Sequence, residues 1–578
     1  MASQFMMTNL DVGNLIVEEM TRLGVTQFVV SPGSRSTPLT VAIARHPKAK
    51  VTIHYDERGA AFFALGYARA TGVPAVLVCT SGTAVANYFP AVIEASMDNI
   101  PMIVLTADRP PELIDVGANQ AIFQHNIYGV YPRLALELAP AHPGSLASDI
   151  LSLVDKLYDT SIGNRPGPVH LNCQFREPLL PETSNDHVNA SFEEKWQEKN
   201  SRFTKQPIRV SILPQDKLKL VLGKMKQSRR SLIVVGRGVS SHHNHKIVEL
   251  AEKLNLPVLA DVQSPLRFTA HPHIINHFDL ALLNEELQQL KPDFVLHLGG
   301  AFTSKRLLNY LNDMSIYYVS VKETPERIDP NHQVQIEFQT DITEFCKSIE
   351  TVRHEHDEHW LNTWQALEKH TALSLNNIFD QQTKLSEPAT SYHLSKFIPG
   401  NHGLMLANSM SIREMEMFGV VGHFGGAVFA NRGSSGIDGL LATTAGYASG
   451  ADTPVTLLIG DLACLHDLNS LDLIKKAKQP IILVVMNNDG GGIFNFLPVS
   501  NQTDVFEPFF GTPHGLTLEH AAAMFKLNYS KPTTMDEFLL TYKTATEQSE
   551  SVLIELITDR TANHQFHQHI FKSLREST

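Results

Sequence analysis

Cysteine is scarce in this chain: only four of its 578 residues are cysteines, and no two of them form a C-x-x-C pair. They stand far apart, at Cys79, Cys173, Cys346 and Cys464. This distribution excludes a disulfide framework and the common zinc motifs. No apolar run approaches the roughly 20 residues of a membrane-spanning helix, and the start of the sequence lacks the basic and apolar regions of a signal peptide. We therefore expect a soluble, cytoplasmic protein.

Positive charge is also in deficit, with 48 Lys and Arg against 60 Asp and Glu and a net charge of −12. Nucleic acid is excluded as the main partner, because binding its phosphates requires a basic surface. Any anionic ligand needs a local pocket of cations. The hydrophobic content of 43% and charged content of 19% are typical of a globular protein with large buried sheets, and the length predicts three or four domains.

Short apolar runs alternate with helical patterns along most of the sequence, and this β-then-α order predicts doubly wound parallel sheets. We expect an α/β protein with three such domains. The strands that define them are predicted at residues 28–30, 51–55, 75–79, 102–106, 232–235, 294–298, 404–407, 428–430, 455–459 and 481–486. The predicted limits are an N-terminal domain at 1–185, a linker at 186–206, a central domain at 207–350, a charged helical linker at 351–385 and a C-terminal domain at 386–578.

Histidine occurs in three local groups, none of which has the spacing of a known metal motif on one helix face. We expect all three groups to be solvated. They are His242, His243 and His245; His354, His356 and His359; and His564, His567 and His569.

The stretch from Pro454 to Pro498 reads as one βαβ unit. Leucine and isoleucine recur at helical spacing between its two strands, so we expect one amphipathic helix there. The crossover makes the strands parallel and brings Asp461 and Asn488 to the same edge of the sheet. A carboxylate, an amide oxygen and a carbonyl from the glycine run at Gly490 are hard ligands, which predict a magnesium site.

Glu57 follows the predicted strand at 51–55 and precedes an apolar helix. In apolar surroundings its pKa would rise, and it would then be suited to exchanging a proton with a ring nitrogen. The alternative is an ordinary acid in the first turn of a helix, favoured by the helix dipole.

Glycine pairs follow two strands of the central domain, at 236–238 and 299–300. They favour tight turns over a nucleotide site, because the G-x-G-x-x-G pattern is incomplete. Ser304, Lys305 and Arg306 follow the second of these strands and are the more informative feature.

G-D at 460–461 followed by N-N at 487–488 is similar to the metal and diphosphate motif of thiamine diphosphate enzymes. Three further stretches narrow the match, namely SPGSRSTPL, LTADRPPELIDVGANQAIFQ, and NSMSIRE with NRGSSGIDG, and they are taken together with GDLACLHDLNSL and NNDGGGIF, which contain the motif itself. Together they resemble the family of 2-succinyl-5-enolpyruvyl-6-hydroxy-3-cyclohexene-1-carboxylate synthases of menaquinone biosynthesis. In that family Leu462 is the expected residue after G-D, although most thiamine diphosphate enzymes have a smaller one.

The resemblance implies a transferase with thiamine diphosphate and Mg²⁺ or Mn²⁺ as cofactors. Glu57 of the pyrimidine-binding N-terminal domain is the implied catalytic residue, which activates the cofactor's aminopyrimidine. The diphosphate is held by the C-terminal domain, usually of a partner subunit, in a homodimer or a dimer of dimers. The implied metal ligands are Asp461, Asn488 and Gly490, and the other cofactor contacts are Ser409, Ile437, Gly491, Ile493 and Phe494.

The implied reaction is decarboxylation of 2-oxoglutarate and addition of the resulting succinyl group to isochorismate. Both substrates are dianions, and arginine forks suit carboxylates. The implied contacts to 2-oxoglutarate are Ser409 and Arg413. Those to isochorismate are Ser34, Arg35, Arg109, Asn119, Gln120, Lys305, Arg306, Arg432, Phe494 and Leu497. The implied apolar wall around the thiazolium consists of Ile437, Ile493, Phe494 and Leu497.

Two other functions remain open at this point. An acetohydroxyacid synthase-like carboligase would have the same architecture, but its monoanionic pyruvate needs fewer arginines. A non-catalytic sensor of a diphosphate ligand would have no use for Glu57, Asp461 and Asn488 together. No histidine stands in a motif as a general base, so we expect proton transfer to run through the cofactor and Glu57.

Overall fold

The computed structural model describes residues 7–181, 196, 198–199, 201–204, 213–352 and 357–576. The chain divides into two compact units. Unit 1 comprises Met1–Ile208, Asn431–Asp452 and His466–Lys478, and unit 2 comprises Arg209–Ala430, Thr453–Leu465 and Gln479–Thr578. Unit 1 therefore combines the N-terminal part of the chain with two short segments from its C-terminal third.

Unit 1 is built on six parallel strands in the order β2-β1-β3-β4-β6-β5. Strands β1, β3 and β4 are wholly buried, which explains why they read as continuous apolar runs in the sequence. The strands are β1 Gln27–Val30, β2 Lys50–Ile53, β3 Val76–Cys79, β4 Met102–Asp108, β5 Leu134–Leu138 and β6 Pro168–Gln174.

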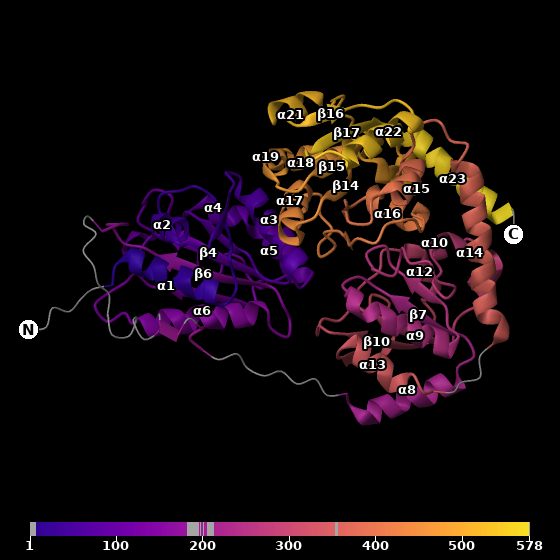
Figure 1. Ribbon diagram of the computed structural model, residues 1–578, viewed down its shortest axis with the longest axis horizontal. Coiled ribbons are helices and arrows are strands. Elements are labelled where there is room, and N and C mark those ends of the chain that lie inside the picture. The colour runs from indigo at the N-terminus through magenta and orange to yellow at the C-terminus, as the bar shows by residue number, and fades with distance from the viewer. Residues whose placement is uncertain are drawn as a thin grey trace, which may run out of the picture. The chain divides into compact units, whose positions relative to one another are not determined.

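Helices connect these parallel strands and cover the sheet (Figure 1). Three of them, α1 Asn9–Arg22, α2 Thr37–Arg45 and α6 Ala147–Ser161, share one buried core with the strands. The other helices of the N-terminal part are α3 Glu57–Thr71, α4 Thr83–Asn87 and α5 Phe89–Met97.

Helix α3 packs against α17 (Leu440–Ala451) so closely that the two backbones touch. A Cβ added to Gly66 would lie 2.0 Å from the carbonyl oxygen of Thr443, and one added to Gly446 would lie 2.0 Å from that of Phe63. Only glycine permits this approach. The contact holds the helix that begins with Glu57 against a segment from the C-terminal third.

A buried carboxylate adds a second anchor in the same unit. Glu94 of α5 accepts hydrogen bonds from the backbone N–H groups of Gly433 and Ser434, at 2.7 and 2.6 Å, and is only 1% exposed. Buried carboxylates need such donors. The segment that leads into α17 is thus held at its start by Glu94 and at its end by the contact between α17 and α3.

Unit 2 contains two further parallel sheets. The central sheet has the order β11-β10-β9-β7-β8 and the C-terminal sheet the order β13-β12-β14-β15-β17-β16. Their strands are β7 Ser231–Val235, β8 Val258–Ala260, β9 Phe294–Leu298, β10 Tyr317–Lys322, β11 Val334–Gln339, β12 Gly403–Leu406, β13 Val428–Phe429, β14 Val455–Gly460, β15 Ile481–Asn487, β16 Asn528–Ser530 and β17 Val552–Ile557.

Helices α8 Gln215–Gln227, α9 Asn244–Leu254 and α13 Ile342–Ile349 pack together on one face of the central sheet. The other face is covered by α10 Phe278–Ala281, α11 Glu285–Gln289 and α12 Lys305–Tyr310. Four helices share one core with the C-terminal sheet, namely α15 Glu387–Phe397, α16 Met410–Phe418, α22 Met535–Thr546 and α23 Arg560–Glu576. Shorter helices of the same part are α18 Asp461–His466, α20 Thr503–Phe506 and α21 Glu519–Met524.

The structure confirms the predicted fold class, since all three sheets are parallel and covered by helices. The predicted domain limits stay a prediction. The linker at 186–206 falls largely outside the described residues, as do His354 and His356. Among the described residues, no helix combines the length and the apolar character that crossing a membrane requires.

Three local predictions were wrong. The connection between β14 and β15 is not one helix but α18, a 3-10 turn at Leu468–Ser470 and α19 Leu471–Lys476. The chain bends there because the buried carboxylate of Asp467 accepts hydrogen bonds from Ala442 N–H and Ser470 Oγ–H. Helix α14 (Glu358–Phe379) lies in the stretch predicted to be helical, but it is not solvated throughout, since Trp364 is buried in the central core and Phe379 in the C-terminal core.

The third correction concerns the histidines, two of which are wholly buried instead of solvated. His243 is 0% exposed, and so is His567, whose Nε2 lies 2.8 Å from the carboxylate of Glu414. Burial is possible because polar partners come from elements distant in sequence.

We predict that Gly66→Ala destabilises unit 1 by about 1–3 kcal/mol, because the added Cβ forces α3 away from α17. The matched control is Gly223→Ala in the middle of α8, where an added Cβ meets no atom within 4 Å. That change should be neutral or stabilising by up to about 1 kcal/mol, since alanine favours a helix. Urea unfolding followed by circular dichroism compares the two, and equal midpoints would contradict the close contact.

Candidate active site

Glu57 stands at the first position of α3, but it does not cap the helix. That role belongs to Asp56, whose carboxylate accepts hydrogen bonds from the N–H groups of Arg58 and Gly59. Glu57 is half-buried, and no cation of the described residues forms an ion pair with it. Burial raises the pKa of Glu57, and the charge of Asp56 raises it further. Glu57 is therefore a carboxyl that is free to exchange a proton.

Two arginines meet at the carboxyl edge of the unit 1 sheet. Arg35, after β1, donates to the carbonyl of Phe175 at 3.0 Å and lies 3.2 Å from the carboxylate of Glu177. Arg109, after β4, donates to the hydroxyl of Ser81. Burial lowers the pKa of Arg109, and the neighbouring charge of Arg35 lowers it further. Two like charges held close together favour binding of an anion.

The loop after β4 borders this pair of arginines. Asn119 and Gln120 are exposed, and Gln120 lies against Gly82, where an added Cβ would be 3.4 Å from the Cβ of Gln120. Gln124, which is not among the predicted site residues, accepts a hydrogen bond from Gly82 N–H at 3.0 Å. Ser34 is exposed, and its carbonyl accepts hydrogen bonds from Thr37. Ser81 lies in TSGTAV, which reads as a plain strand-to-helix turn. Gln124 is the last residue of LTADRPPELIDVGANQAIFQ, in which only Arg109, Asn119 and Gln120 were given a role.

The structure brings Asp461 and Asn488 together in unit 2, after the adjacent parallel strands β14 and β15. The carboxylate of Asp461 accepts a hydrogen bond from Gly490 N–H at 2.9 Å. Asn488 donates through its Nδ2, while its Oδ1 is buried without any hydrogen-bond partner. Gly490 has φ +132°, and a Cβ there would lie 1.9 Å from the carbonyl oxygen of Gly511. No other residue fits this turn.

These groups fit a divalent cation. Asp461 supplies a carboxylate, Asn488 an amide oxygen that lacks a partner, and the glycine turn backbone carbonyls. Mg²⁺ and Mn²⁺ prefer such oxygen ligands. A buried polar atom without a partner costs free energy, so Asn488 Oδ1 points to a ligand that completes the site.

Two residues around Asp461 were not foreseen. His514 Nε2 lies 3.1 Å from the carboxylate of Asp461, and Arg560 donates to the carbonyl of Asn488 at 3.2 Å. Both come from parts of the sequence without a recognisable motif. They show that two later segments of the chain contact Asp461 and Asn488.

A third unforeseen residue, Glu387, lies directly behind Asn488. Its carboxylate accepts the hydrogen bond from Asn488 Nδ2 at 2.7 Å and is 4% exposed. Burial raises the pKa of Glu387 to about 8, and the charges of Glu414 and Asp461 add to the rise. In the sequence it looks like a common first-turn acid after the N-cap Ser386. In the structure, the hydrogen bond from Asn488 Nδ2 to Glu387 orients the amide so that Asn488 Oδ1 points away from Glu387.

Arg413 of α16 is a cation without a carboxylate partner among the described side chains. It donates to the carbonyl of Ser409 at 2.5 Å, and burial lowers its pKa. Ser409 itself has φ +70°, so this corner is strained into the left-handed region. The pair suits a small carboxylate.

Arg306 differs from Arg413, because it already has an acid. It forms an ion pair with Asp279, and its guanidinium lies 4.6 Å from the ring centre of Phe571. Lys305 is exposed, whereas Ser304 caps α12. A ligand would therefore find Lys305 freer than Arg306.

Of the four residues predicted for the apolar wall, Ile493, Phe494 and Leu497 belong to unit 2 and Ile437 belongs to unit 1. A 3-10 turn at Gly492–Phe496 contains Ile493 and Phe494, and Gly491 is its N-cap. The ring of Phe494 packs against that of Phe510, with 5.5 Å between the ring centres. Leu497 is exposed. Ile437, which is 36% exposed, and Arg432 belong to unit 1.

Comparison with known proteins gives one consistent result. A family model described as "Thiamine pyrophosphate enzyme, N-terminal TPP binding domain" matches residues 10–127, and one described as "Middle domain of thiamine pyrophosphate" matches residues 190–406. The 2-succinyl-5-enolpyruvyl-6-hydroxy-3-cyclohexene-1-carboxylate synthase of Rubrobacter xylanophilus is 42% identical over 97% of this chain and 97% of its own length. Synthases of the same name from Chlorobium phaeobacteroides and Salinibacter ruber are each 40% identical over 97% of this chain and 97% and 96% of their own lengths.

We predict that Glu387→Ala lowers the affinity for Mg²⁺ about 10- to 100-fold, because the amide of Asn488 loses the acceptor that orients it. Glu387→Gln keeps an acceptor oxygen and should retain most of the affinity. Calorimetric titration of Mg²⁺ in the presence of excess thiamine diphosphate measures the effect. Unchanged affinity in the alanine variant would refute the orienting role.

Proposed function

This chain belongs to the family of 2-succinyl-5-enolpyruvyl-6-hydroxy-3-cyclohexene-1-carboxylate synthases, and on that basis we propose that it is a thiamine diphosphate-dependent transferase of menaquinone biosynthesis. It decarboxylates 2-oxoglutarate and adds the succinyl group to isochorismate. The observation that carries this proposal in the structure is the unpartnered amide oxygen of Asn488 beside Asp461. Similarity over nearly the whole chain supports the same activity.

The metal and the diphosphate would be held in unit 2. Asp461, Asn488 and a carbonyl at Gly490 would bind Mg²⁺ or Mn²⁺. The glycine run after Asn488 would let the backbone come close to the phosphate oxygens, as a residue with a side chain would not. When bound, thiamine diphosphate supplies the nucleophilic carbon and the electron sink for decarboxylation. Ser409, Ile437, Ile493 and Phe494 are further proposed contacts to this cofactor.

Glu57 would hold a proton against a ring nitrogen of the cofactor. Its raised pKa and its lack of an ion-pair partner among the described residues support this role. As in the resemblance noted from the sequence, we propose that Glu57 comes from a second copy of the chain. The enzyme would then be a cytoplasmic homodimer or a dimer of dimers.

The cations divide between the two substrates. Arg413, which has no carboxylate partner among the described residues, and Ser409 would bind 2-oxoglutarate. The close pair Arg35 and Arg109 would bind a carboxylate of isochorismate. Further proposed contacts to isochorismate are Ser34, Asn119, Gln120, Lys305, Arg306, Arg432, Phe494 and Leu497.

An assay with purified protein tests the activity directly. With thiamine diphosphate, Mg²⁺, 2-oxoglutarate and isochorismate, we expect loss of isochorismate and release of CO₂. Pyruvate in place of 2-oxoglutarate should give little turnover, because it lacks the second carboxylate. Equal turnover with pyruvate would favour an acetohydroxyacid synthase-like enzyme, and no turnover with either would favour a non-catalytic sensor.

Glu57→Gln should lower kcat by about 10²–10⁴-fold, because the amide cannot exchange the proton. Binding of thiamine diphosphate, followed by calorimetry, should remain. Asp56→Asn is the comparison: asparagine still caps α3 and removes only the smaller cause of the raised pKa of Glu57, so its activity should fall far less than that of Glu57→Gln. Full activity of Glu57→Gln would refute the proton-transfer role.

A further inference from the structure

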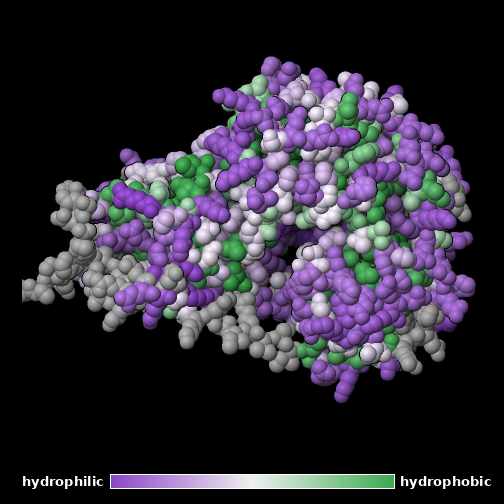
Figure 2. Space-filling view, viewed as in Figure 1, coloured by the Kyte–Doolittle hydropathy of each residue, from purple (hydrophilic) through white to green (hydrophobic). Residues whose placement is uncertain are grey.

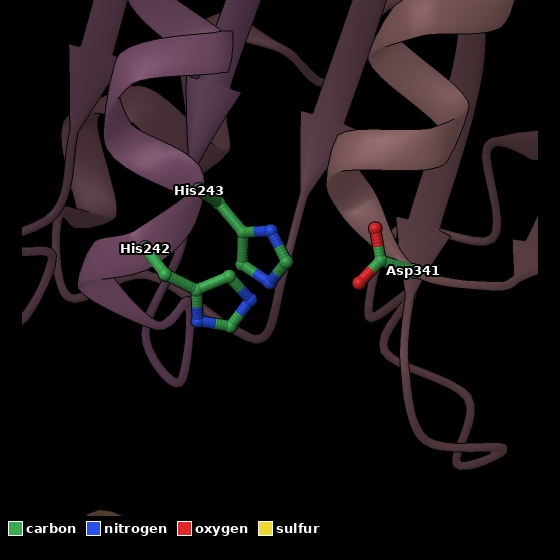
Figure 3. A group of neighbouring side chains, drawn as sticks. All are labelled: His242, His243 and Asp341. Atoms are coloured by element: carbon green, nitrogen blue, oxygen red, sulfur yellow. The ribbon is translucent and has the colours of Figure 1, made fainter.

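We propose that the central sheet region of unit 2 binds a Zn²⁺ ion between His242, His243 and Asp341 (Figure 3). The site lies outside the residues that serve the thiamine diphosphate chemistry, and it does not depend on that proposal. One ligand atom from each of the three side chains lies within 4.8 Å of the others.

The three residues come from two corners of the central domain. His242 and His243 form a 3-10 turn between β7 and α9, and Asp341 is the N-cap of α13, which follows β11. Helices α9 and α13 pack together in one core, so the turn and the cap are neighbours. The surface over α9 and α13 is mostly hydrophilic (Figure 2), which leaves His242 open to water and ions.

Both imidazoles are oriented as metal ligands are. His242 Nδ1 lies 2.8 Å from Ser240 Oγ, and His243 Nδ1 lies 2.8 Å from Thr343 Oγ1. When each Nδ1–H donates to its hydroxyl, each Nε2 carries a free lone pair, which is the usual arrangement of a metal-bound histidine. Figure 3 shows the two rings side by side and facing Asp341.

The decisive atom is Nε2 of His243. The residue is 0% exposed, and this nitrogen has no hydrogen-bond partner. Burial of a polar atom without a partner is unfavourable. A bound cation would give His243 Nε2 the partner that it lacks.

Glu323, just after β10, supplies a fourth group. Its Oε1 lies 3.2 Å from His243 Nε2, although the angle gives no hydrogen bond. Neighbouring ligands of tetrahedral zinc are about 3.3 Å apart when the bonds are about 2.0 Å long. Two imidazoles with two carboxylates form a closed ligand set that suits Zn²⁺, whereas Mg²⁺ takes oxygen ligands alone. A zinc ion bound by these four side chains would link the loops that follow β7, β10 and β11.

Calorimetry of the cofactor-loaded protein tests the site. With thiamine diphosphate and Mg²⁺ at saturation, titration with ZnCl₂ should reveal one zinc site per chain. His242→Ala should weaken it at least about 10-fold. His245→Ala changes an exposed histidine of the same segment and should leave the affinity unchanged.

Asp341→Asn provides an independent variant, because asparagine still caps α13 but lacks the carboxylate. Zinc should raise the melting temperature of the wild type and of His245→Ala, and much less that of His242→Ala and Asp341→Asn. Equal zinc affinity and equal thermal shifts in all four proteins, or no zinc binding by the wild type, would overturn the proposal. Neither result would bear on the thiamine diphosphate activity.

Discussion

Parallel strand pairing is the constraint on which every candidate site in this chain depends. The carboxyl ends of parallel neighbours meet at one edge of a sheet, so residues far apart in sequence become neighbours. Asp461 and Asn488 follow β14 and β15, which pair in register from Val455 with Ile481 to Gly460 with Met486. Arg35 and Arg109 meet at the same edge in unit 1, and His242 and Asp341 at that of the central sheet.

Burial gives these edges their chemistry. Removing a carboxyl from water raises its pKa, as it does for Glu57 and Glu387, while removing a guanidinium lowers its pKa, as it does for Arg109 and Arg413. The net charge of the chain is −12, but Arg109 and Arg413 lie where burial lowers the local dielectric, so each would attract an anion more strongly than an exposed cation does. For binding an anion, the position of the cations therefore matters more than the net charge of the chain.

The strands were the most predictable part of the fold. Strand β9 lies at the predicted residues, and β14 and β15 extend one residue further than expected. Strands buried on both faces are continuous apolar runs, which periodicity detects without tertiary information. Asp461 and Asn488 were predictable for a related reason, since the crossover rule converts their sequence positions into a shared edge. The connection at 461–476 was not, because the carboxylate of Asp467 that breaks it is held by Ala442 of another segment.

The sequence by itself determined the α/β class and the positions of several strands, and it indicated a glycine-rich turn after the strand at 481–486. Local patterns carry that information, because burial and backbone freedom act residue by residue. Only the tertiary structure decided that Glu387 orients Asn488, that His514 reaches Asp461, and that the buried His243 faces Asp341. Each of these contacts joins residues at least 50 positions apart, and no local propensity records which distant side chain will satisfy a buried polar atom.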